Sequence, residues 1–135
     1  MADNGLGVER PLSPHLQVFR PLFTMMMSIV HRITGAALYF GIVLLAWWLI
    51  AAASGPHYFA YVSAFVGSFL GRLILFGFTW ALIHHMLGGI RHFLWDTERG
   101  FELKQVELLA RLTLAGSVVL TLAVWVAGYM MMGEL

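Results

Sequence analysis

Three long apolar stretches, separated by short polar segments, dominate the pattern along the chain. They run from Ile33 to Ala53, from about Tyr61 to Ile83 and from Leu112 to Met132. The first and third contain no charged residue, and the second contains only Arg72. About 20 apolar residues in a helix cross a hydrocarbon core of about 30 Å. Because an open chain in lipid satisfies its backbone only as a helix, we expect three transmembrane helices.

The helices should extend beyond these apolar cores. We expect the first to begin near Thr24 and the second to reach about Trp95. A Gly-Pro pair in Ser54–His57 marks the first connector, and Thr97–Lys104 forms a charged second connector. The sequence thus predicts an all-α integral membrane protein with a cytoplasmic N-terminal segment over residues 1–23 and a three-helix transmembrane anchor domain over residues 24–135.

Lysine and arginine are unevenly distributed between the two sides of the predicted spans. They occur before and in the first turns of the first span and around the second connector, at Arg10, Arg20, Arg32, Arg91, Arg99, Lys104 and Arg111. The first connector and the residues after Met132 have none. The positive-inside rule therefore places the N-terminus in the cytoplasm and the C-terminus outside. The N-terminal segment lacks the pattern of a signal or transit peptide, which favours a bacterial inner membrane over a mitochondrial one.

Composition narrows the possible functions. Hydrophobic residues make up 60% of the chain and charged residues 11%, against about 25% charged residues in soluble domains. The net charge of +1 provides no basic surface for nucleic acid. With no cysteine, iron–sulfur ligation, thiolate catalysis and c-type haem attachment are excluded. A redox centre on this chain would need ligands from its six histidines or eight methionines.

The start of the first span holds one group of polar candidates. Ser28 and Arg32 are one helical turn apart and share a face, and His31 precedes Arg32. His31 and Arg32 offer hydrogen bonds or positive charge to an anion. Position and charge alone leave open a second reading, in which these residues are anchors that extend to the membrane surface.

The end of the second span holds the other group. His85 and His92 lie on nearly the same helical face, and Gly89, one turn from His85, would let a flat macrocycle approach the backbone. His84 is rotated by about 100° from His85, so the two cannot bind one iron. Satisfied core histidines are the alternative for this group. For Asp96, at the helix end, the alternative is a solvated surface charge.

The two groups lie at comparable depth from the same side of the membrane. At 1.5 Å per residue, Arg32 is roughly 12 Å deep and His85 roughly 15 Å deep. A porphyrin bound to His85 could therefore extend its propionates to His31 and Arg32. This depth relation predicts a haem site near the cytoplasmic face.

Three motifs in this order resemble a known family. They are Arg10-Pro11-Leu12-Ser13-Pro14-His15-Leu16, Ser28-x-x-His31-Arg32-x-x-Gly35 and His85-x-x-x-Gly89-x-Arg91-His92-x-x-x-Asp96. Their order and spacing, with the three-span layout, resemble the cytochrome b556 subunits, the large membrane anchors of succinate dehydrogenase (respiratory complex II). Phe19 departs from the family, whose members often have Tyr there.

The resemblance implies a set of roles. His85 would be one axial ligand of a haem b, and a small membrane-anchor subunit would supply the second ligand. His31 and Arg32 would lie near the haem propionates, while Ser28 and Arg32 would line a ubiquinone pocket. Electrons would arrive from succinate through a flavoprotein and an iron–sulfur subunit, so this chain would perform no dicarboxylate chemistry. His92 and Asp96 are candidates for relaying protons to the quinone.

Other functions remain open on the sequence. A fumarate reductase-type anchor would use the same parts in the opposite direction. A redox-inactive membrane scaffold or small transporter subunit would use its histidines to bind a proton or a metal. A Soret band in the purified complex distinguishes the cytochrome from such a scaffold. The resemblance favours ubiquinone over menaquinone, but the residues alone do not decide between them.

Overall fold

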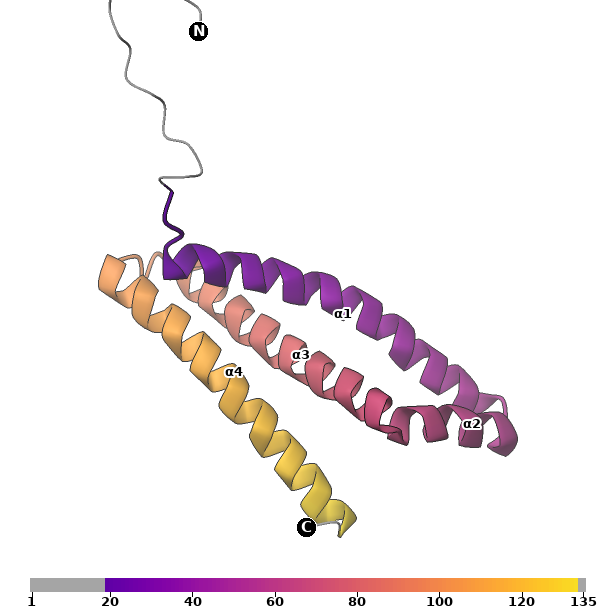
Figure 1. Ribbon diagram of the computed structural model, residues 1–135. Coiled ribbons are helices and arrows are strands. Elements are labelled where there is room, and N and C mark those ends of the chain that lie inside the picture. The colour runs from indigo at the N-terminus through magenta and orange to yellow at the C-terminus, as the bar shows by residue number, and fades with distance from the viewer. Residues whose placement is uncertain (1–18, 134–135) are drawn as a thin grey trace, which may run out of the picture.

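The computed structural model describes residues 19–133, which form four helices joined by short turns (Figure 1). The helices are α1 (Phe23–Ala53), α2 (Pro56–Gly67), α3 (Phe69–Asp96) and α4 (Leu103–Met132). Of these, α1, α3 and α4 are long and apolar enough to cross a membrane. The predicted all-α fold with three spans is therefore confirmed. The Pro-rich motif, Arg10–Leu16, lies outside the described residues.

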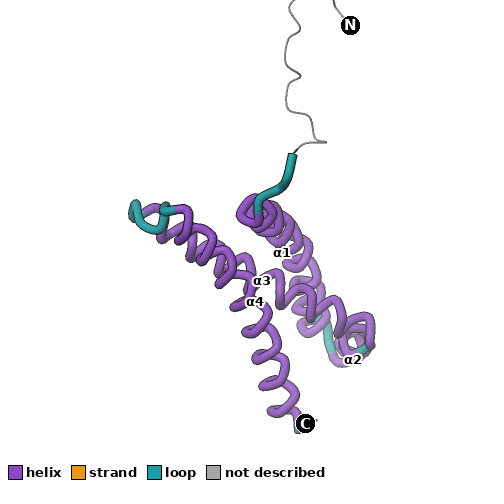
Figure 2. Tube along the Cα trace, turned by 60° about the vertical axis from the view of Figure 1, so that its left-hand side comes forward, coloured by secondary structure: helices purple, strands orange, loops and turns teal. Residues whose placement is uncertain are grey.

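The long helices are arranged around α3. In Figure 1, α1 and α3 run side by side in opposite directions. Helix α4 runs antiparallel to α3, and the distance between α4 and α1 grows toward the end of α4. The bundle has two ends, which also stand apart in Figure 2. We call the end that holds the start of α1 and the turn between α3 and α4 the histidine end. The opposite end, which holds α2 and the end of α4, is called the distal end. The orientation of the two ends relative to the cytoplasm stays a prediction. So does the boundary between residues 23 and 24 that separates the N-terminal segment from the transmembrane anchor domain.

The sequence pattern predicts one continuous helix over the second apolar stretch. This prediction is wrong, because the structure has two helices there. The stretch is divided at Ser68, whose backbone is extended, and α3 begins at the next residue. The Ser68 hydroxyl accepts a hydrogen bond from the backbone N–H of Gly71 at 3.1 Å and so caps α3. A side chain at Gly71 would overlap the backbone oxygens of Phe65 and Val66. The corner between α2 and α3 therefore requires glycine at position 71.

Small and hydroxyl-bearing residues provide the contact between helices. The buried residues of α4 form a stripe about one turn apart, namely Ala110, Thr113, Ser117 and Thr121. The Thr121 hydroxyl donates to the backbone oxygen of Ser117 at 2.7 Å, so its polar atom is satisfied within the helix. Such residues let membrane helices approach closely. Most of the large apolar side chains instead point outward and are exposed, as expected where lipid is the solvent.

Candidate histidine site

Two histidines from different helices pair at the histidine end. The rings of His31 on α1 and His85 on α3 are stacked, with centroids 4.1 Å apart and planes 7° apart. His85 Nδ1 lies 3.1 Å from the backbone oxygen of His31, and His31 Nε2 lies 3.3 Å from that of His85. Because a carbonyl oxygen only accepts, each of these ring nitrogens carries the proton and donates it. The pair thus joins α1 to α3 through two reciprocal hydrogen bonds.

Two glycines make this close pairing possible. A Cβ at Gly88 would overlap the His31 ring, and a Cβ at Gly35 would lie 2.8 Å from His85 Cε1. Each ring therefore lies against the bare backbone of the opposite helix. Gly35 belongs to the motif in the first span, whereas no sequence pattern indicates that Gly88 faces His31.

The hydrogen bond to His31 leaves the other nitrogen of His85 available. Within residues 19–133, His85 Nε2 has no hydrogen-bond partner. With the proton on Nδ1, Nε2 carries the lone pair that can ligate a metal. A Cβ built at Gly89, one turn further along α3, would meet nothing within 4 Å. These features fit an iron ligand beside an open helix surface, because a ligating histidine normally donates its other N–H to a fixed acceptor.

The neighbouring His84 occupies a different environment. Its side chain is 1% exposed, and its Nδ1 lies 3.2 Å from the Ser117 hydroxyl of α4. The Trp80 ring packs beside it, with centroids 5.2 Å apart. His84 thus faces α4 while His85 faces α1, consistent with the rotation of about 100° between successive helix positions. The His84 environment is that of a satisfied core histidine.

The other polar candidates of the first span lie on the surface beside the pair. Ser28 and Arg32 are both exposed, one turn apart on α1, and Arg32 directly follows His31. Across the part of the chain that the structure describes, neither side chain makes a hydrogen bond or an ion pair. Both are therefore open to a ligand or to another subunit.

Further along α3, one of the two predicted relay residues adjoins the pair. The His92 ring is exposed and its centroid lies 5.3 Å from that of His31 and 5.1 Å from that of Trp95. Asp96 is the last residue of α3 and is exposed. No hydrogen bond or ion pair joins Asp96 to His92 among the described residues. The structure therefore brings His31, His85 and His92 together and leaves Asp96 apart from them, at the exposed end of α3.

Arg91 is a further candidate, which the sequence motifs alone do not connect to a role. Its side chain is only 6% exposed, and its Nε is buried with no hydrogen-bond partner in residues 19–133. Its guanidinium carbon lies over the Trp95 ring, 5.0 Å from the centroid. A charged residue in a membrane span is costly unless it meets a partner. That cost was the signal that could have identified Arg91.

Comparison with known proteins identifies a family. A family model described as the succinate dehydrogenase/fumarate reductase transmembrane subunit matches residues 7–124. The chain is 49% identical over 120 residues to a succinate dehydrogenase cytochrome b556 subunit of Paracoccus denitrificans. The matched segment covers 89% of this chain and 92% of the relative. The chain is 36% identical to the cytochrome b556 subunit of Rickettsia prowazekii, over 87% of this chain and 92% of that protein. The mitochondrial cytochrome b560 subunit of Sus scrofa is 38% identical, over 90% and 70% respectively.

Proposed function

Because the chain belongs to the succinate dehydrogenase/fumarate reductase transmembrane subunit family, we propose that it binds haem b and quinone as the membrane anchor of a succinate:quinone oxidoreductase. Flavoprotein and iron–sulfur subunits would carry out the succinate chemistry and deliver electrons to ubiquinone at this anchor. The observation that carries the proposal is the state of His85, whose Nδ1–H is held by the His31 carbonyl while Nε2 stays available.

His85 would be the iron ligand on this chain. The His31 carbonyl fixes the orientation of the imidazole and, by accepting the Nδ1 proton, makes Nε2 a stronger donor to a metal. A haem b bound there supplies a carrier for one electron at a time. The open helix surface at Gly89 and the single ligand that this chain offers would leave room for a second iron ligand, a histidine of a small membrane-anchor subunit.

Positive charge near His85 suits the negatively charged propionates of a haem. Arg32 follows His31 on α1 and is exposed, so its guanidinium can reach an anion at the surface of the bundle. His31 contacts the His85 ring directly. Arg32 would therefore hold the propionates, and His31 would join it as an imidazolium that donates its Nδ1–H, because its Nε2–H is taken by the His85 backbone oxygen.

Quinone reduction places negative charge on the quinone oxygens before protons arrive. The Ser28 hydroxyl can donate a hydrogen bond to such an oxygen, and the Arg32 guanidinium stabilises the charge. Both side chains are exposed on the same side of α1 and are not engaged elsewhere in the described residues. His92 and Asp96, exposed along the end of α3, would pass protons from the adjoining aqueous side.

This arrangement implies a location as well as partners. The histidine end would face the cytoplasm of a bacterium and meet the iron–sulfur subunit there, in agreement with the positive-inside rule. The relatives from Paracoccus and Rickettsia are bacterial, which supports an inner-membrane location. A fumarate reductase-type anchor remains the second candidate, because the matched family model includes both enzymes.

Optical difference spectra of the purified complex test the haem assignment. We expect a b-type band in the reduced-minus-oxidised spectrum of the wild type, lost in His85→Ala and retained in the matched variant His84→Ala. A band that survives His85→Ala but not His84→Ala would move the ligand to the other histidine. A wild-type complex without any b-type band would leave a membrane anchor that carries no haem.

A further inference from the structure

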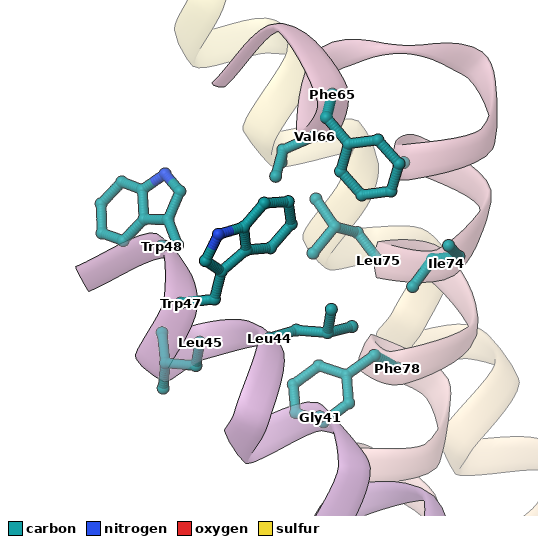
Figure 3. Close-up of a pocket in the computed structure, with 11 residues that line it drawn as sticks. Gly41, Leu44, Leu45, Trp47, Trp48, Phe65, Val66, Ile74, Leu75 and Phe78 are labelled. Carbon is teal, nitrogen blue, oxygen red and sulfur yellow. The ribbon is translucent and has the colours of Figure 1, made fainter. Parts of the chain in front are cut away.

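A cavity of about 330 Å³ lies at the distal end of the bundle, away from the histidines (Figure 3). Helices α1, α2 and α3 all contribute to its wall, which is almost entirely apolar. Its side chains include the aliphatic Leu44 and Leu75 and the aromatic Trp47, Phe65 and Phe78. The volume falls within the range of about 300–1,000 Å³ that is typical of small-molecule sites.

The fold constructs this cavity from features that the proposed function does not use. The Phe78 ring occupies the space where a Cβ of Gly41 would lie, and these two residues form one end of the cavity in Figure 3. The corner at Ser68 turns α2 toward α1 at the other end. There the Phe65 ring packs beside Trp47, with centroids 5.6 Å apart. The break in the second apolar stretch thus positions one wall of the cavity.

The lining determines the chemistry of an occupant. Two indole N–H groups lie near the rim: Trp47 Nε1 already donates to the Tyr58 hydroxyl at 2.9 Å, whereas Trp48 Nε1 has no hydrogen-bond partner in residues 19–133. The Trp48 N–H is the one side-chain donor left in the described lining, and a single donor at the rim cannot bond both carbonyls of a quinone ring or replace the several partners that a headgroup phosphate needs. An unfilled apolar wall also loses dispersion contacts on its open side. The cavity therefore fits a flexible aliphatic chain without polar atoms.

The surroundings determine the source of such a chain. Leu44 is 38% exposed and Leu75 is 37% exposed, so the cavity opens onto the outer surface of the helices. That surface belongs to two membrane-spanning helices, where lipid chains are the solvent. We propose that the cavity binds an acyl chain of a membrane phospholipid, whose headgroup lies at the distal surface. This site is independent of haem, quinone and the direction of electron flow.

Photo-crosslinking in the assembled complex tests the proposal. The purified complex is reconstituted into phosphatidylethanolamine vesicles that contain a phosphatidylcholine with a diazirine near the end of one acyl chain. After irradiation, labelled peptides are mapped by mass spectrometry. We expect label on the cavity residues of the wild type, loss of this label in Leu75→Trp, and full label in Leu73→Trp. Leu73 is also on α3 and exposed, but it does not line the cavity.

A second pair of variants guards against a failure of one protein to assemble. Leu44→Trp fills the cavity from α1, and Leu49→Trp is its exposed control on the same helix. Label that is unchanged by both filling variants would overturn the proposal. So would the absence of label in the wild-type cavity, which would mean that a partner helix covers it. Displacement of the label by an isoprenoid quinone would assign the cavity to a quinone tail instead.

Discussion

Adding a single methyl group at Gly88 should disrupt the histidine pair. In Gly88→Ala the new Cβ would overlap the His31 ring, which lies against the backbone of α3 at this point. Either α1 moves away or His31 rotates, and both changes strain the hydrogen bonds at 3.1 and 3.3 Å between the two histidines. An increase of less than 1 Å in the helix separation takes both beyond hydrogen-bonding distance.

The size of the effect follows from three contributions. Overpacking a tight contact costs about 1–3 kcal/mol, and each lost hydrogen bond costs about 0.5–1.5 kcal/mol. Replacing glycine by alanine within a helix returns at most about 1 kcal/mol, so the disruption outweighs the gain. Loss of the acceptor that orients a ligating histidine typically weakens metal binding about 10–100-fold. Gly88→Ala should therefore lower haem affinity by about this factor.

The assay compares two glycine variants of the same helix. Haem per complex is measured by pyridine haemochrome during titration with a competing apo-haem protein. Gly77→Ala is the control, because a Cβ at Gly77 would meet nothing within 4 Å. We expect Gly77→Ala to retain haem as the wild type does, and Gly88→Ala to lose it at lower competitor concentration. Equal retention in the two variants would refute the proposed dependence of the ligand on the His31 contact.

Four further predictions concern single residues. Ser117→Ala removes the hydroxyl that partners buried His84, so the complex should lose about 1–3 kcal/mol of stability in thermal melts; unchanged melting would show that this bond contributes nothing. Arg91→Gln removes a buried positive charge, so the haem midpoint potential in redox titrations should fall; an unchanged or higher potential would mean that Arg91 is remote from the haem. Arg32→Gln should lower kcat for quinone reduction, measured with excess quinone, more than Arg32→Lys does; equal rates would exclude a role for its charge. Gly71→Ala should destabilise the corner between α2 and α3 by about 1–3 kcal/mol and lower the melting temperature, and unchanged melting would contradict the tight contact seen there.

Much of the fold could be predicted because lipid imposes one strong requirement. Chains of apolar residues of sufficient length become helices in a membrane, and the three expected spans are confirmed. The corner at Ser68 escaped prediction because residues on both sides of it are equally apolar. Its cause is local: a serine that caps α3 and a glycine that faces the backbone of α2. Neither changes the hydropathy of the segment.

The level of the candidate residues along the helix axes could be predicted from the sequence, but their mutual contacts could not. Helix rise alone placed the first-span residues and His85 at a similar level, and the structure stacks His31 on His85. The reciprocal hydrogen bonds depend on how the helices are rotated against each other, which Gly35 and Gly88 determine. His84 finds its partner at Ser117, which is 33 residues away in the chain. Contacts of this kind follow from packing and have no local pattern in the sequence.

The ligation of iron by His85 can be tested most directly by a cryo-electron microscopy map of the purified, assembled complex. We predict continuous density from the iron of a haem b to His85 Nε2, with His85 Nδ1 within hydrogen-bonding distance of the His31 backbone oxygen. The second axial density should lead to a histidine of a smaller membrane subunit. Iron bound to His84, or to no residue of this chain, would contradict the proposal.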